Sequence, residues 1–181
     1  MKRISLIFVI AVLLTISSAW GLGAYLPFAD GDYSDWGRLK ICDADYMCVD
    51  DALNEENTWV HTTSSDVKEL FRLRVIDYTS GAKNNISFWF NATRVDADNN
   101  RFVPFIKTHD LEYSYDIITA SSSWDIYTFS LFENPATGQL WTDEELAVVQ
   151  VGVKTLSYNP GAKVASVSMV VECIGDPQTC Y

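Results

Sequence analysis

Residues 67–75 read VKELFRLRV, and residues 85–91 read NISFWFN. In each stretch, side chains at alternate positions share a character. One face of each stretch consists of Val67, Glu69, Phe71, Leu73 and Val75 in the first, and of Ile86, Phe88 and Phe90 in the second. A period of two with one apolar face is typical of half-buried β-strands. We therefore expect a strand in each stretch.

The rest of the chain extends this pattern. Three later stretches, 124–132, 148–155 and 164–173, are rich in β-branched and aromatic residues, with clusters of turn-forming residues between the runs. One short helix is expected near 142–148, because Thr142 and Glu145 have the spacing of a capping box. Many short strands with a single helix predict an all-β domain, a two-sheet antiparallel sandwich or jelly roll.

Residues 1–21 have the pattern of a secretory signal peptide. Lys2 and Arg3 precede an apolar run over residues 4–14, and small residues allow cleavage near 19–21. The apolar run is shorter than the ~20 residues that a membrane-spanning helix needs. We therefore expect cleavage, secretion to the extracellular surface, and membrane contact only through the signal peptide.

The expected mature chain, residues 22–181, is one acidic domain that begins with an apolar arm over residues 22–28. It has 11 basic and 24 acidic residues, a net charge of −13. Such a charge repels nucleic acids and anionic lipid surfaces. The composition therefore excludes nucleic acid as a partner.

The four cysteines, an even number in a chain expected to be exported, predict disulfide bonds. Cys42 and Cys48 are close in sequence, so a bond between them requires the intervening residues to fold back. Cys173 and Cys180 enclose a Gly-Asp-Pro turn, which favours a local bond there. A zinc site would use different spacings. The three possible connectivities remain open at this point.

Two groups of short segments resemble those of a known class of domains. They are YMCVDD (46–51) with TWV (58–60), and NPATG (134–138) with WTDEE (141–145) and VGVK (151–154). Together they resemble jelly-roll domains of phage and virus structural proteins and of secreted prokaryotic surface proteins. The resemblance extends over roughly residues 30–173. It implies a jelly-roll fold and a non-enzymatic role at an extracellular or particle surface, and it supplies no catalytic residues.

Catalytic motifs are lacking in the sequence. His61 and His109 are far apart, and there is no G-x-S-x-G, H-E-x-x-H or phosphate-binding glycine loop. Two carboxylates would suffice for a glycosidase, but no pattern distinguishes a pair among the acidic residues. We therefore expect no enzymatic activity, with a hydrolase as a competing alternative.

Two acidic turns are candidate calcium sites. Asp30, Asp32 and Asp35 in the first, and residues 96–100 in the second, place oxygen-bearing side chains close together, as hard cations require. The same residue types also build tight turns without a metal. Calcium is therefore the one cofactor that the sequence suggests, and turn formation is the alternative.

Two glycosylation sequons begin at Asn85 and Asn91. In a strand both asparagines share a face with Trp89, opposite the apolar face, and we expect that face to be exposed. An outward Trp89 would offer an aromatic platform to a sugar ligand. The alternative is that Trp89 packs under a loop or against a neighbouring subunit.

These features predict a secreted, non-catalytic structural or adhesive protein of a cell or particle surface. In one version, copies form an extracellular filament in which the arm, residues 22–28, completes the sheet of the next copy. In the competing version, the arm is a strand of its own sandwich. The alternative function is a carbohydrate-binding module stabilised by calcium, with glycans as partners.

Overall fold

A computed structural model of the chain describes residues 22–39, 42–50, 58–77 and 83–173. The expected signal peptide lies outside these residues. The strands are β1 (Leu22–Ser34), β2 (Gly37–Arg38), β3 (Val60–Thr62), β4 (Lys68–Asp77), β5 (Lys83–Thr93), β6 (Arg101–Thr108), β7 (Leu111–Ser114), β8 (Ile118–Thr119), β9 (Asp125–Leu131), β10 (Gln150–Lys154) and β11 (Ala162–Cys173). The helices are η1 (Tyr46–Cys48), a single 3₁₀ turn, and α2 (Asp143–Val148). Within the described ranges, no helix is long and apolar enough to cross a membrane.

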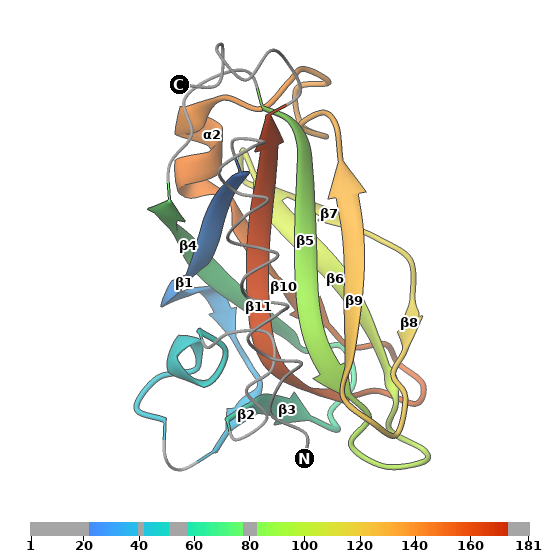
Figure 1. The fold of residues 1–181 in the computed structure, drawn as a ribbon. Helices are drawn as coiled ribbons and strands as arrows, with labels where there is room; N and C mark the ends of the chain where they lie inside the picture. Colours follow the sequence, from blue (N-terminus) through green and yellow to red (C-terminus); the bar gives the residue numbers. More distant parts are fainter. Residues whose placement is uncertain (1–21, 40–41, 51–57, 78–82, 174–181) are drawn as a thin grey trace, which may run out of the picture.

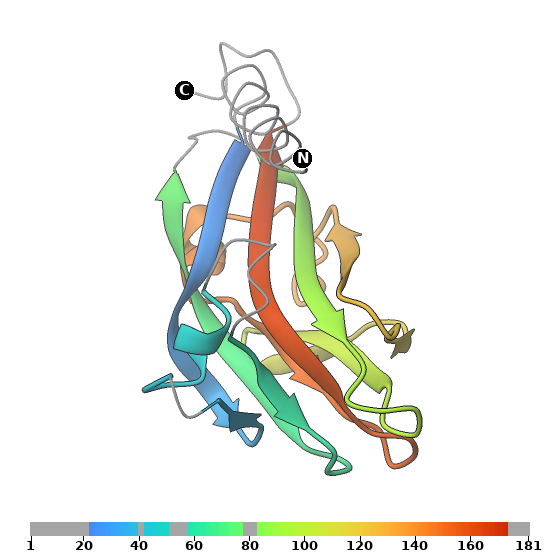
Figure 2. The ribbon, with the colours of Figure 1, turned by 60° about the horizontal axis from the view of Figure 1, so that its bottom comes forward.

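The strands form the expected antiparallel sandwich. Their main order is β9-β5-β11-β1-β4-β10-β6-β7, and every neighbouring pair is antiparallel. In Figure 1 β9, β5 and β11 lie in front of β6, β10 and β4, so the continuous sheet folds into two layers. Strand β1 connects the layers, because it pairs with β11 at its start and with β4 along its length. Figure 2 shows β1, in blue, between these two strands.

The core lies between the two layers. The apolar faces expected for β4 and β5 are buried in it: Phe71, Ile86, Phe88 and Phe90 have no exposed surface, and Leu73 is 3% exposed. An aromatic ring from a neighbouring strand stacks on them: the ring centroids of Phe129, in β9, and Phe88 are 4.7 Å apart. Glu69 lies on the same face of β4 and is also fully buried. An acidic group in this position requires a separate explanation.

Helix α2 begins at the capping box that the sequence predicts. The Thr142 hydroxyl accepts a hydrogen bond from the Glu145 N–H at 3.2 Å, and the Glu145 carboxylate accepts one from the Thr142 N–H at 2.9 Å. These bonds satisfy two of the N–H groups that the first turn leaves unpaired. Leu146, fully buried, anchors the helix to the core.

A disulfide bond joins Cys42 and Cys48, whose Cα atoms are 5.7 Å apart. The chain between them folds back through η1, as a bond across this short separation requires. This bond excludes the two connectivities in which Cys42 and Cys48 pair with Cys173 and Cys180. The bond favoured between Cys173 and Cys180 would involve the Cys173 side chain and residue 180. Both lie outside the described part of the chain, so this bond stays a prediction.

The apolar arm expected over residues 22–28 forms the first half of β1. It pairs with β11 through Leu22–Tyr25 and with β4 from Ala24 onward, both within the same chain. The structure therefore has the self-contained arrangement. Donation of the arm to another copy would require β1 to leave the middle of the sheet, and it stays an untested hypothesis.

Candidate functional site

Residues Gly31–Tyr33 form a bulge in β1, here called the β1 bulge. The register passes from Asp30 opposite Phe71 to Ser34 opposite Glu69, so β1 advances four residues while β4 advances two. A Cβ atom at Gly31 would lie 2.7 Å from the Leu70 Cβ, which requires glycine at this close approach. The extra residues therefore lie against the outer face of β4, and bulges of this kind re-aim side chains.

A row of three polar side chains crosses this outer face. Arg72 of β4, Gln150 of β10 and Lys107 of β6 lie directly opposite one another in the strand register, and we call them the polar row. Residues opposite one another in a sheet project their side chains from the same face. The row is therefore a consequence of how the three strands pair.

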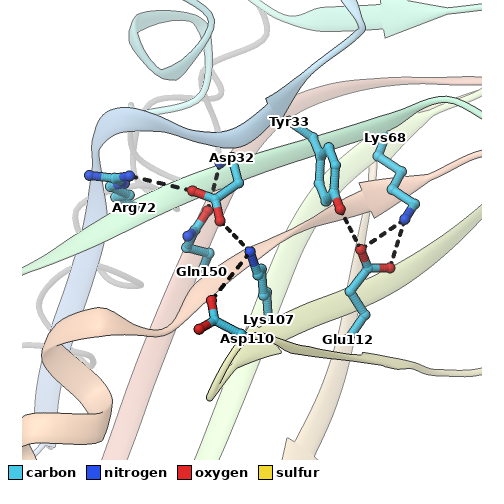
Figure 3. A network of polar contacts seen from close by, with 8 residues as sticks. All are labelled: Asp32, Tyr33, Lys68, Arg72, Lys107, Asp110, Glu112 and Gln150. Atoms are coloured by element: carbon cyan, nitrogen blue, oxygen red, sulfur yellow. Dashed lines mark hydrogen bonds and ion pairs between the residues drawn. The ribbon is translucent and has the colours of Figure 1, made fainter.

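Asp32, in the β1 bulge, contacts every member of the polar row (Figure 3). Its carboxylate pairs with the Lys107 Nζ and lies 3.4 Å from the Arg72 Nη2, and its N–H donates to the Gln150 Oε1 at 2.7 Å. Hydrogen bonding to Lys107 is the main cause that lowers the pKa of Asp32. Asp32 is therefore ionised at neutral pH and holds the row in place.

Tyr33 fixes the other end of the bulge. Its hydroxyl donates to the Glu112 Oε1 at 2.8 Å, and the Lys68 Nζ contacts both oxygens of Glu112 at 2.7 and 2.8 Å. Burial of Glu112 acts to raise its pKa, but the hydrogen bonds from Lys68 and Tyr33, together with the charges of Lys68 and Lys154, outweigh burial and lower it. The bulge is thus held against β4, β6 and β7 by two charged networks.

A cleft of about 490 Å³ opens beside the polar row. The side chains that matter for its chemistry are Phe28, Asp32, Arg72, Lys107, Asp110 and Val148. Phe28 and Val148 are large apolar groups with 42% and 68% of their surface exposed. Asp32 and Asp110 balance the charges of Arg72 and Lys107. The cleft therefore combines hydrogen-bonding groups of zero net charge with exposed apolar surface.

A tight hairpin turn forms one edge of the cleft. His109 and Asp110 have φ angles of 51° and 59°, and they join β6 to β7 with Thr108 opposite Leu111. Two successive left-handed residues are the signature of a type I′ turn, whose twist suits antiparallel strands. The turn brings Asp110 to 3.7 Å from the Lys107 Nζ and the His109 Nε2 to 3.5 Å from the Glu145 carboxylate.

The three acids expected to bind calcium do not gather at one place. Asp32 contacts the polar row, whereas Asp35 accepts a hydrogen bond from the Lys68 N–H at 3.2 Å. Asp30 groups instead with Asp45 and Glu69. The structure therefore does not bring Asp30, Asp32 and Asp35 together, because the β1 bulge directs Asp30 and Asp32 to opposite faces of the sheet, and calcium binding itself stays a prediction.

The second acidic turn has the hydrogen bonds expected of a turn that closes on itself, and metal binding there stays a prediction. The Asp96 carboxylate accepts hydrogen bonds from the N–H groups of Asp98 and Asn99, both at 2.9 Å. These bonds lower its pKa, with the Asn99 side chain as the largest cause. The pattern is an Asx turn, which uses the carboxylate to cap its own loop.

Strand β5 places both sequon asparagines and Trp89 on the side away from the core, as the alternation predicts. The expected exposure is not found for Asn91, which is only 3% exposed. Trp89 is half-buried, and among the described residues its indole N–H has no hydrogen-bond partner. Use of Asn85 and Asn91 as acceptors and ligand binding by Trp89 stay predictions.

Sequence reasoning did not single out Gln150, Lys107 or Arg72. None of these residues lies in a recognisable motif. The polar row exists only because strands that are distant in sequence pair with one another. Glu69 did give a visible signal, because it is an acid within an otherwise apolar alternation. That signal marks the second group of polar residues, described below.

No known family model matches the sequence, and no curated protein matches it significantly. Among solved structures, the chain is similar to a xylan-binding module CBM15, with a TM-score of 0.45, 12% identity and coverage of 84% of this chain and 90% of that chain. It is also similar to the C-terminal CBM6 of LamC from Zobellia galactanivorans, with a TM-score of 0.43, 7% identity and coverage of 81% and 98%. These values assign neither a family nor a ligand to the chain.

A further similar structure is Xylanase10C from Cellvibrio japonicus in complex with xylopentaose, with a TM-score of 0.44 and 13% identity. The match covers 84% of this chain but only 27% of that chain. The jelly-roll part of the expected resemblance agrees with the fold described above. An origin among phage and virus structural proteins finds no support in these comparisons.

Proposed function

We propose that the protein is a non-catalytic carbohydrate-binding module whose ligand, a neutral oligosaccharide, binds in the cleft beside the polar row. The observation that carries this proposal is the combination of charge-balanced polar side chains with exposed apolar groups. Sites for small ligands typically place a few fixed polar groups among apolar ones. The cleft has both, on a rigid sheet.

The chemistry of the cleft suits a polyhydroxylated ligand. Sugar hydroxyls donate and accept hydrogen bonds, and the cleft offers donors at Arg72 and Lys107 and an acceptor at Asp32. Because these charges neutralise one another, the cleft attracts neither anions nor cations strongly. The ring of Phe28 provides an apolar surface for the C–H face of a sugar ring. Water displaced from such surfaces adds to binding.

The geometry disfavours a hydrolase in this cleft. A glycosidase needs one carboxyl group with a raised pKa to act as the acid, beside a second that stays ionised. The pKa of Asp32 is lowered instead, chiefly by its hydrogen bond with Lys107. Asp110 lies against the same ammonium group. Both carboxylates thus serve to position Lys107.

A glycan array followed by calorimetry tests the proposal. Truncation of Arg72 to Ala should lower affinity for the neutral glycans found on the array by about 10- to 100-fold, because a charge-assisted hydrogen bond contributes about 1.5–3 kcal/mol. Arg74→Ala is the matched control, since Arg74 is an exposed arginine two residues along the same strand and face. Phe28→Ala should also weaken binding.

The outcome has clear alternatives. Absence of binding to every neutral glycan on the array, or selection of acidic glycans alone, would contradict the proposed ligand class. Equal affinity of the Arg72→Ala and Arg74→Ala variants would place the ligand elsewhere on the molecule. The filament hypothesis is tested separately, by measuring the size of the protein in solution.

A further inference from the structure

Three carboxylates converge on the core side of β1 and β4. They belong to Asp30 of β1, Glu69 of β4 and Asp45, which directly precedes η1, and we call them the carboxylate cluster. One oxygen from each lies within 4.8 Å of the other two. Asp45 is 1% exposed and Glu69 is fully buried. Acidic side chains are almost never buried to this degree without a partner.

Two members of the cluster have partners that hold them in place. The Asp45 carboxylate lies 3.0 Å from the Arg38 Nη1 and also accepts a hydrogen bond from the Ser34 hydroxyl. The Asp30 Oδ1 accepts a hydrogen bond from the Tyr46 N–H at 2.7 Å. These contacts connect the disulfide-closed loop around η1 to β1.

Glu69 is only half satisfied. Its Oε2 accepts a hydrogen bond from the Trp36 N–H at 3.0 Å, whereas its Oε1 is buried and has no hydrogen-bond partner within the described part of the chain. Buried polar atoms without a partner are rare in native proteins and are destabilising, most of all in a charged group. The free oxygen belongs to the carboxylate that approaches Asp30 and Asp45.

When all three carboxylates are ionised, they face a single guanidinium group, that of Arg38, and the cluster then has a net charge of −2. We propose that Asp30, Asp45 and Glu69 bind a divalent cation, with calcium as the preferred ion. Calcium takes oxygen ligands in irregular arrangements, whereas magnesium demands near-octahedral geometry and keeps several waters. The cation would fasten the loop around η1 to β1 and β4.

A proton on Glu69 is the competing occupant. Removal from water is the main cause that raises the pKa of Glu69 to about 9, and the charges of Asp45 and Asp30 act in the same direction. Glutamine at this position reproduces the shape and neutrality of the protonated side chain. Glu69→Gln should therefore fold whichever occupant is correct, and it separates the two.

This proposal does not rest on the carbohydrate-binding function. The carboxylate cluster lies on the core side of β4, whereas Arg72 of the polar row projects from the opposite face. Loss of cation binding therefore leaves the glycan proposal intact, and loss of glycan binding leaves the cation proposal intact.

Calorimetric titration of calcium and magnesium into the oxidised, chelator-treated protein provides the test. Salt at about 0.15 M screens weak binding to the acidic surface. We expect one saturable calcium site, and a rise in the unfolding midpoint of roughly 5–10 °C when calcium exceeds its Kd a hundredfold. Glu69→Gln should weaken calcium binding at least tenfold, and Asp45→Asn should do the same.

Glu133→Gln is the matched control, because Glu133 is an exposed acid outside the cluster and outside both acidic turns, and its removal changes the net charge equally. It should bind calcium as the unchanged protein does. Two results would overturn the proposal: no saturable binding of calcium or magnesium, or equal calcium affinity with and without Glu69→Gln. The first result, together with a Glu69→Gln variant more stable than the unchanged protein, would identify a proton as the occupant.

Discussion

Strand β4 divides its charged side chains between two environments. Lys68 and Arg72 lie on the outer face, where they pair with Glu112 and Asp32. Glu69 lies between them in sequence but points into the core side, where burial raises its pKa. Because neighbouring residues in a strand face opposite ways, one strand contributes to the cleft and to the carboxylate cluster.

Glycine at position 152 is required by the pairing of β10 with β4. A Cβ atom there would lie 1.8 Å from the backbone oxygen of Glu69, closer than any real contact. We expect Gly152→Ala to destabilise the protein by more than about 4 kcal/mol, because the backbone itself must move. Gly138→Ala is the control: it has a φ of 65° but open space around it, and should cost only about 1–2 kcal/mol. Similar denaturation midpoints for both variants would contradict this account.

Glu112 predicts an acid-sensitive contribution to stability. Its pKa lies below the usual 4.5, so the native state favours the ionised form. The stabilisation is therefore present above pH 4.5 and is lost as the pH falls through the lowered pKa. We expect Glu112→Gln to cost about 1 kcal/mol at neutral pH, as a partly exposed pair does, and to cost nothing in acid. Denaturant unfolding at several pH values measures the difference, and a constant difference would contradict the prediction.

At the scale of elements, one bulge and one short loop create both candidate sites. The β1 bulge places Asp32 over the polar row, and on the other side of β1 the loop around η1 brings Asp45 to Asp30. The disulfide between Cys42 and Cys48 closes that loop and restricts its conformations. The candidate sites therefore depend on irregular segments held by regular strands.

Helix α2 borders the cleft, and its capping box sets where it begins. Thr142→Ala removes the side-chain oxygen that accepts from the Glu145 N–H, and should cost about 1 kcal/mol. Thr142→Ser keeps that oxygen and should lie within a few tenths of a kcal/mol of the unchanged protein. Thermal unfolding compares the two. Equal losses for both variants would mean that the Thr142 methyl group, rather than the hydrogen bond, matters.

For the whole molecule, local patterns were sufficient for the strands but not for the sites. The alternation around Phe71 and Phe88 predicts which faces are buried, because a strand's two faces follow directly from its sequence. The polar row and the carboxylate cluster depend on register and on the bulge, which bring together residues far apart in the chain. The burial of Asn91 likewise depends on what covers a face, and alternation alone does not report it.

The position of β1 in the middle of the sheet gives the self-contained sandwich and strand donation different expected behaviour. In the self-contained molecule, Tyr25 of the arm is core, at 3% exposure, whereas Phe28 is 42% exposed. Tyr25→Ala should therefore destabilise the isolated protein by about 3 kcal/mol or more, and Phe28→Ala by less than about 1 kcal/mol.

Deletion of residues 22–28 extends the same argument. It would remove the strand that joins β11 to β4, and we expect the shortened chain to lose cooperative unfolding and to aggregate. A subunit that receives its strand from a neighbour behaves differently: the shortened chain, when mixed with intact copies, would stay folded and end their filaments. Near-ultraviolet circular dichroism and light scattering on the shortened chain, alone and in such mixtures, distinguish the two. A folded, soluble shortened chain would show that β1 is not an obligatory part of its own sheet.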